Sequence, residues 1–276
     1  MKLPAKLRLS IGRFLAPVGI INPHHEPHLF WSVERPQFAR SIVPSTWSLD
    51  GVLLSGRPGA GFSFAVGMVS GLDGAGFSSG GIRDGRIQER SGFNPPSVTG
   101  RLEYELPGFE GPRRFLRISA SFFGGAVSNG AQGEDNGLDA DLGLLAFSFD
   151  ARWELFRLRA EAAATHLTEA LPDPEVARRT LGFYVEPAVH LPGAWLRPLK
   201  LADAIVFARL EKVDTQFERF DDLPRDGAGD RRYWTGGLAV FLTPTVALKA
   251  DLTRVTDAAG SEPGLLVNAG VGFAFP

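Results

Sequence analysis

Three features of the sequence predict an all-β protein whose strands form a transmembrane, antiparallel, up-and-down barrel. Apolar and polar residues alternate with period two in about twelve segments, which is the pattern of strands with two different faces. Several of these segments run for about 10 to 14 residues, which is longer than most strands of soluble proteins. The connections between them alternate between long and short, as they do in barrels of outer membranes.

The clearest alternation lies between Arg114 and Leu167. In the segment RFLRISASFFGGAV (114–127), apolar residues occupy every second position, and arginine and serine stand between several of them. The segment WELFRLRAEAAATHL (153–167) repeats this pattern with arginine and glutamate on its polar face. Each segment suits one bilayer crossing by a tilted strand, with lipid outside the barrel and water inside it.

The remaining elements follow the same rule in chain order, within one domain that covers residues 1–276. The expected strands are 7–14, 51–56, 62–68, 98–104, 114–127, 138–150, 153–167, 181–190, 202–211, 233–242, 246–253 and 265–275. The expected long loops are 15–49, 71–95, 128–137, 168–178, 213–230 and 257–263, and the expected short turns are 57–60, 106–113, 150–151, 191–198 and 243–245. An even number of crossings places both ends of the chain on the same side of the membrane.

Composition narrows the class of protein further. The formal net charge of −2 provides no basic field for nucleic acid, and the absence of cysteine excludes disulfides and cysteine-based metal or redox sites. Mean hydropathy is −0.01 and no run of 18 apolar residues occurs, so no membrane-spanning helix is predicted. The chain starts without the apolar stretch of a secretory signal. We interpret it as an N-terminally incomplete fragment, or as the processed part of a longer precursor.

A soluble β-sandwich is the alternative fold, because its strands also alternate between a buried and a polar face. The apolar faces in this sequence continue for four or five positions without a charge. Together with the strand lengths and the alternating loops, this continuity favours the membrane barrel.

Charged residues on the polar faces of the expected strands are candidates for the lining of a water-filled lumen. Such charges create a field that selects ions. They could equally pair with one another and brace the wall of a narrow barrel, and both interpretations stay open. The residues are Arg101, Glu103, Arg117, Arg157, Arg159, Glu161, Arg209, Glu211, Lys249 and Asp251.

The long segment 15–49 is the best candidate for a loop that folds inward and narrows the lumen. It carries His24, His25, Glu26, His28, Arg35 and Arg40. Imidazoles and a carboxylate so close together are metal-ligand types, but no fourth ligand at helical spacing accompanies them. The alternatives are hydrogen bonds to loop backbone or to the nearby arginines, and a pH-sensitive role at the lumen. We therefore predict no metal and no cofactor.

No enzymatic activity is predicted. Outer-membrane phospholipases place serine and histidine on the outer face of a barrel, which makes Ser121 with His166, or His190, the residues to consider. None of them belongs to a recognisable hydrolase motif.

The first fifty residues add a resemblance to a known family. The stretches GRFLAPVGIINPHHEP (12–27), VERP (33–36) and IVPSTWSLDGVLLSG (42–56) resemble porins of outer membranes related to phosphate-selective porins O and P. Gly12-Arg13-Phe14 matches the family's strand motif, and Trp47 with Asp50-Gly51-Val52 matches the re-entry after its long loop. The resemblance implies a sixteen-stranded barrel, usually a homotrimer, with an inward-folded loop as constriction. This chain supplies about twelve strands, and a series of lysines and arginines that would bind phosphate is not recognisable in it.

These observations predict an outer-membrane porin in contact with outer-membrane lipid. Its expected activity is passive diffusion of small hydrophilic solutes, with anionic solutes as one option because several of the lumen residues are arginines. Acids accompany those arginines, so strong anion selectivity does not follow. The alternative is a structural or adhesive barrel that acts through its extracellular loops and has a blocked lumen.

Overall fold

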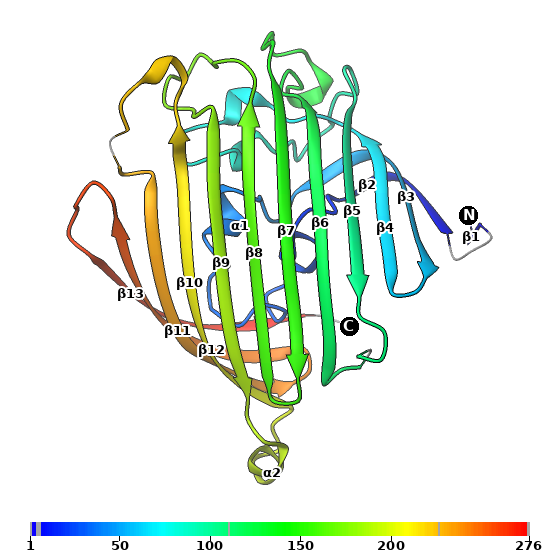
Figure 1. The fold of residues 1–276 in the computed structure, drawn as a ribbon, viewed down its shortest axis with the longest axis vertical. Helices are drawn as coiled ribbons and strands as arrows, with labels where there is room; N and C mark the ends of the chain where they lie inside the picture. Colours follow the sequence, from blue (N-terminus) through cyan, green and yellow to red (C-terminus); the bar gives the residue numbers. More distant parts are fainter. Residues whose placement is uncertain (1, 4–6, 110, 226, 275–276) are drawn as a thin grey trace.

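Every strand of the protein pairs with its neighbours in sequence, and together the strands form one antiparallel sheet (Figure 1). The computed structural model describes residues 2–3, 7–109, 111–225 and 227–274. The strands are β1 (Lys2–Leu3), β2 (Leu7–Leu15), β3 (Ser48–Gly59), β4 (Phe62–Val69), β5 (Ser97–Glu105), β6 (Arg114–Ala126), β7 (Asp141–Trp153), β8 (Phe156–Leu167), β9 (Arg179–His190), β10 (Asp203–Glu218), β11 (Asp230–Thr243), β12 (Val246–Asp257) and β13 (Gly264–Phe273). Twelve of them are the strands that the periodicity predicts, and the two-residue β1 is additional. The up-and-down antiparallel order is confirmed.

Several strand ends differ from the sequence-based expectation, most clearly those of β7 and β10. β7 continues past the expected corner at 150–151 to Trp153, and β8 starts at Phe156 after a two-residue turn in which Glu154 has a positive φ of 53°. β10 runs to Glu218 and pairs with β11 as far as Asp214 opposite Asp230, so the first part of the expected loop 213–230 is strand. The prediction was wrong there because strands that continue into a polar region lose the apolar alternation on which the prediction depended.

The sheet is strongly curved, and its two edges are not joined to each other in the part of the chain that the structure describes. The strand order starts at β1 and ends at β13, without pairing between β13 and β1 or β2. Figure 1 shows the sheet bending around the segment that connects β2 to β3. The sheet therefore has a convex face, a concave face and two edges.

The convex face is apolar and the concave face is polar over most of the sheet, as the alternation predicts. In β6, Ile118 is 48% exposed while its neighbour Ser119 is buried. In β7, Phe147 is 56% exposed while Ser148 is buried, and the same contrast holds on β8, where Arg159 and Glu161 are buried. Monomeric soluble proteins rarely expose a continuous apolar surface of this extent.

Large aromatic residues lie near both ends of this apolar face. Trp153 and Phe156 flank the turn between β7 and β8, and Trp234 and Phe217 lie near the opposite ends of β11 and β10. All four side chains are at least 43% exposed. Aromatic girdles at the two edges of an apolar band are typical of barrels in membranes.

The helices are short. They are α1 (Phe38–Ser41), α2 (Gly193–Leu196) and the 3₁₀ turns η1 (Asn22–His24), η2 (Gly74–Gly76), η3 (Arg83–Gly85), η4 (Ala131–Gly133), η5 (Arg197–Leu199) and η6 (Phe220–Asp222). Among the described residues, none of these helices has the length and apolar character needed to cross a membrane.

The concave side is not water-filled at the end that carries the long loops, which corrects the expectation of a wet interior there. Inward-facing Phe123 of β6 and Leu142 and Leu144 of β7 are buried in one apolar cluster. Ile42 and Trp47 from the β2–β3 segment belong to the same cluster. β7 is therefore apolar on both faces here, because one face is exposed outside and the other packs on a loop.

Candidate functional site: an inward-folded loop on a charged wall

The segment 16–47 lies on the concave side of the sheet, where part of it packs into the apolar cluster (Figure 1). Its two ends are held together by backbone and side-chain hydrogen bonds. The N–H of Ala16 donates to the carbonyl of Trp47 at 2.8 Å. Asn22 is fully buried and donates to the carbonyls of Ala16 and Trp47, while its Oδ1 accepts from the N–H of Trp47. The segment is therefore a closed unit that docks as a body, and we call it the inner loop.

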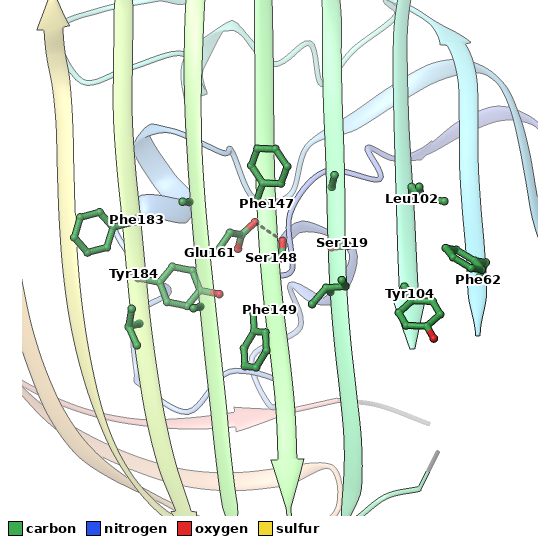
Figure 2. Close-up of a pocket in the computed structure, with 15 residues that line it drawn as sticks. Phe62, Leu102, Tyr104, Ser119, Phe147, Ser148, Phe149, Glu161, Phe183 and Tyr184 are labelled. Atoms are coloured by element: carbon green, nitrogen blue, oxygen red, sulfur yellow. Dashed lines mark hydrogen bonds between the residues drawn. The ribbon is translucent and has the colours of Figure 1, made fainter. Parts of the chain in front are cut away.

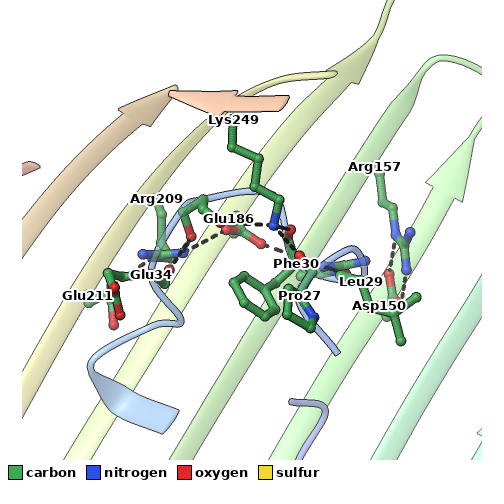
Figure 3. A network of polar contacts seen from close by, with 12 residues as sticks. Pro27, Leu29, Phe30, Glu34, Asp150, Arg157, Glu186, Arg209, Glu211 and Lys249 are labelled. Carbon is green, nitrogen blue, oxygen red and sulfur yellow. Dashed lines mark hydrogen bonds and ion pairs between the residues drawn. The ribbon is translucent and has the colours of Figure 1, made fainter. Parts of the chain in front are cut away.

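Lys249 on β12 anchors the inner loop at its centre (Figure 3). Its ammonium donates to the carbonyl of Ser32 at 3.1 Å and also to the carbonyls of Pro27 and Phe30. It lies 4.1 Å from the centre of the Phe30 ring. Three acceptors satisfy all three donors of the ammonium group, so this charge is bound to the loop and not free in a lumen. Two positions along the strand, Asp251 accepts the N–H of Val33 at 2.6 Å.

Arg209 on β10 is the centre of a second set of contacts. Its guanidinium donates to Glu211 at 2.7 Å, to Glu186 at 3.1 Å and to the Ser32 hydroxyl at 2.6 Å. Glu211 in turn accepts the N–H of Phe38 at the start of α1, at 3.1 Å. The three charged side chains are at most 4% exposed. Buried charges remain stable only when paired, so the wall and the inner loop depend on each other here.

Trp31 is the aromatic anchor of the loop. The Arg159 guanidinium lies 4.1 Å from the centre of its ring, within the range of a cation–π contact. The same guanidinium donates to the carbonyl of Leu29 at 3.3 Å and approaches Glu186 at 3.9 Å. His190 meets the Trp31 ring edge-on at 6.5 Å between ring centres.

A third attachment lies at Gly19, where the loop backbone touches the wall. The Gly19 N–H donates to the Ser121 hydroxyl at 3.1 Å, and its carbonyl accepts from Arg101 at 2.6 Å. The next N–H, of Ile20, donates to Glu161 at 3.1 Å. Gly19 has a φ of +72°, and a side chain on it would collide with the Glu161 carboxylate. Both the conformation and the close approach require glycine.

Replacing Gly19 with valine is expected to destabilise the protein by about 1 to 3 kcal/mol, because it forces a β-branched residue into a left-handed conformation against the wall. Chemical unfolding of the protein in lipid vesicles, followed by circular dichroism, measures the loss. Gly108 to valine is the control, since Gly108 also has positive φ but nothing lies within 4 Å of its missing side chain. If both variants lose the same stability, the steric contact with Glu161 contributes nothing.

A polar cavity of about 600 Å³ lies on the other side of the inner loop, towards the short turns. We call it the vestibule. Ion pairs line its wall: Arg101 with Glu103 at 2.7 Å, Arg117 with Glu105 at 2.9 Å, and Arg157 with Asp150 at 2.7 Å. Figure 3 shows the pair of Arg157 and Asp150 beside the loop. Arg57 and Arg152 also face the vestibule, and in the described part of the chain neither has a carboxylate within 4.0 Å.

The structure thus divides the predicted lumen residues into two groups. The first group lines the vestibule and consists of Arg101, Glu103, Arg117 and Arg157. The second group lies under the inner loop and consists of Glu161, Arg209, Glu211, Lys249 and Asp251. Arg159 belongs to both groups, as does Arg101, since each borders the vestibule and donates a hydrogen bond to a carbonyl of the inner loop. Whether any of them lines a conducting pore stays a prediction.

The predicted loop residues lie close together but serve different contacts. His24 and His25 place their Nδ1 atoms 3.2 Å and 3.1 Å from loop carbonyls, and Nδ1 of His28 is 3.7 Å from Glu26. His24 and His28 border the vestibule. Arg35 donates to the carbonyl of His25 at 2.9 Å, and Arg40 lies 3.5 Å from Glu34. No group of three metal-ligand side chains occurs among the described residues.

Several residues of the site were not singled out from the sequence. Glu186 had a signal, because it alternates with apolar residues along β9 and so belongs to its polar face. Trp31 and Ser32 had none, because the inner loop has no periodic pattern to indicate which residues face the wall. Arg83 and Arg86 lie in a glycine-rich loop far away in sequence and contact the inner loop only in the folded structure.

The outer face carries an apolar groove of about 820 Å³ across the middle strands. Figure 2 shows the aromatic rings that border it, including Phe147, Phe149 and Phe183, and the Ser148–Glu161 hydrogen bond of the same strands. Small side chains such as Ala120, Ala160 and Ala162 line the groove between the rings. The groove lies within the exposed apolar face, and Ser119, Ser148 and Glu161 also border it.

No known family profile matches this chain. It is 28% identical over 273 residues to an uncharacterized protein of Aquifex aeolicus (strain VF5), an alignment that covers 90% of this chain. The chain spans 58% of the length of that relative. Among solved structures, a BenF-like porin from Pseudomonas fluorescens Pf-5 overlaps 95% of this chain and 74% of its own, with 10% identity and a TM-score of 0.37. That overlap is too loose to carry an argument, and the fold rests on the strand pairing itself.

Proposed function

We propose that the chain forms the wall and the constriction of an outer-membrane channel of the porin class. The observation that carries this proposal is the contrast between the two faces of one curved sheet. The convex face exposes apolar side chains from strand to strand, whereas the concave face carries charges and holds the inner loop. Lipid outside and water inside is the environment that such a wall requires.

Closure of the sheet into a barrel belongs to the proposal. In lipid, an open sheet edge would leave backbone groups without hydrogen bonds, each at a cost of several kcal/mol. Either β13 closes on β1 and β2, or further strands join the two edges, as the sixteen-stranded resemblance implies. Assembly into a homotrimer is part of the same proposal, and light scattering of the purified protein in detergent measures it.

Small hydrophilic solutes are the proposed cargo, with a mild preference for anions. Six arginines and four carboxylates border the vestibule: Arg57, Arg101, Arg117, Arg152, Arg157 and Arg159 against Glu103, Glu105, Asp150 and Asp203. The excess of positive charge supports a preference, and the close pairing of most of these groups limits it. The field in a narrow pore depends on such unbalanced charges.

Planar-bilayer recording tests the channel. Purified protein is expected to insert and give discrete conductance steps. Under a salt gradient across the bilayer, the reversal potential is expected to have the sign of a channel that prefers anions to cations. Replacing Arg57 and Arg152 with glutamine removes the two unpaired charges and is expected to shift that potential towards the value for cations. Inserted protein that gives no steps would overturn the channel proposal.

A structural or adhesive barrel is the second candidate, and the apolar cluster at the long-loop end favours it. Trp47, Phe123 and their neighbours form a buried apolar cluster in the interior there. In that case the protein inserts into membranes, conducts no ions, and binds its partner through the long loops. Failure of conductance combined with loop-dependent adhesion would support this candidate.

A further inference from the structure

We propose that Arg35, Arg83 and Arg86 form a binding site for a soluble oxyanion, which fastens the loop 70–96 onto the inner loop. The three side chains come from two loops that are well separated in sequence. They converge on one dipeptide, Ser45-Thr46, just before β3 begins. The site is distinct from the vestibule, and it concerns how the loops are held and not what passes through the protein.

The geometry brings the guanidinium groups close together. Nη1 of Arg35 and Nη1 of Arg83 both lie 3.4 Å from the Ser45 hydroxyl oxygen. Nη1 of Arg86 donates to the Ser45 carbonyl at 2.6 Å and to the Thr46 hydroxyl at 2.7 Å. Thr46 has a φ of +58°, an uncommon conformation for a β-branched residue. Three positive charges therefore share a space that offers only neutral acceptors.

In the described part of the chain no carboxylate forms an ion pair with these three arginines, and Glu34 and Asp84 act on them only from a greater distance. Among the described residues, no Asp or Glu oxygen lies within 4.0 Å of Arg35, Arg83 or Arg86, whereas neighbouring Arg40 has Glu34 at 3.5 Å. The Nε of Arg35 is buried and has no hydrogen-bond partner. A buried, charged donor without an acceptor is destabilising unless a ligand supplies one.

The electrostatic environment of the three arginines also favours binding of an anion. Burial lowers the pKa of Arg35 and of Arg83, and the charge of a neighbouring arginine lowers each pKa further, while Glu34 and Asp84 offset part of the lowering. For Arg86, burial and the charge of Arg83 lower the pKa to about 10. A bound dianion would relieve this repulsion, and the planar guanidinium matches the oxygen spacing of sulfate or phosphate.

The site faces water and not lipid. Arg35 also borders a small cavity of about 140 Å³ on the concave side, which Arg209, Glu211 and Asp251 line and which Arg83 and Arg86 do not. Lipid headgroups lie on the convex side of the proposed barrel, so the fitting ligand is a free oxyanion with two charges. Because the ligand would contact both loops, binding would couple the position of the loop 70–96 to that of the inner loop.

Calorimetric titration of the folded protein in detergent with sodium sulfate tests the site, with ionic strength held by sodium chloride. Wild-type protein is expected to bind one sulfate per chain. Arg83→Gln and Arg86→Gln are each expected to weaken binding by roughly tenfold or more, because each removes charge-assisted hydrogen bonds. Arg90→Gln, an exposed change of the same charge in the same loop, is expected to leave the affinity unchanged.

Protection of the loop from protease gives an independent measurement. Sulfate is expected to slow cleavage after Glu89, which is exposed in the same loop, in wild-type protein and not in Arg86→Gln. If a glutamine variant does not fold, Arg86→Lys replaces it and is expected to bind more weakly than wild type. Absence of saturable binding to wild-type protein, or equal weakening by Arg90→Gln, would overturn the proposal. Neither outcome depends on whether the protein conducts ions.

Discussion

Replacing Arg209 with leucine is expected to lower the free energy of unfolding by about 3 to 5 kcal/mol, because the change removes the closest cation from two buried carboxylates, one of which keeps only Arg159 at 3.9 Å. Those carboxylates are Glu186 and Glu211, which are 2% and 1% exposed. The loss also removes the hydrogen bond to Ser32 of the inner loop. Urea unfolding of the protein in lipid vesicles, followed by circular dichroism, measures the change.

Two further variants separate the effect of charge from that of packing. Combining Arg209→Leu with Glu186→Gln and Glu211→Gln is expected to recover part of the loss, since the uncompensated charges disappear. Arg114→Leu is the surface control, because its pair with Glu154 is about half exposed and exposed ion pairs contribute little. A loss below about 1 kcal/mol in Arg209→Leu would mean that water reaches this network and screens it.

Replacing Trp47 with alanine is the second change with a large expected effect, a loss of about 3 to 5 kcal/mol from the cavity left behind. Trp47 is fully buried and its ring meets that of Phe123 at 5.0 Å between centres. Its backbone also forms the hydrogen bonds with Asn22 that hold the two ends of the inner loop together. The same urea unfolding in vesicles gives the magnitude.

Trp47→Phe is the matched control for this prediction. The indole Nε1 is buried without a hydrogen-bond partner, so a phenyl ring removes an unsatisfied donor while it fills most of the space. We expect a much smaller loss than for alanine. Equal losses in both variants would show that the indole contributes something other than packing on Phe123.

The strands could be predicted from the sequence because a strand between lipid and a polar interior must alternate. Residues such as Ile118 and Ser119 have opposite chemical character because they face opposite sides of the sheet. The same rule placed Arg159, Glu161 and Lys249 on the concave face. It could not show what covers them, because a charge beneath a loop and a charge in open water follow the same alternation.

The inner loop was recognised from its length and its motifs, but its contacts could not be derived. Lys249 donates to three backbone carbonyls of the loop. Because every residue has a backbone carbonyl, the sequence cannot indicate which ones accept these hydrogen bonds. The pairing of Arg83 and Arg86 with Ser45 depends on two loops that have no common pattern. The apolar cluster around Trp47 was missed for a related reason, since a strand that is apolar on both faces looks like any buried strand.

Single-channel recording of Lys249→Ser beside the wild type is the most direct test of the central claim, that the inner loop narrows a membrane channel. The change releases the carbonyls of Pro27, Phe30 and Ser32 from the wall, so the loop loses its central anchor. We expect larger and more variable conductance steps than in wild-type protein, whereas Lys212→Ser on the polar end of β10 changes nothing. Steps of identical size and stability in wild type and Lys249→Ser would contradict the claim.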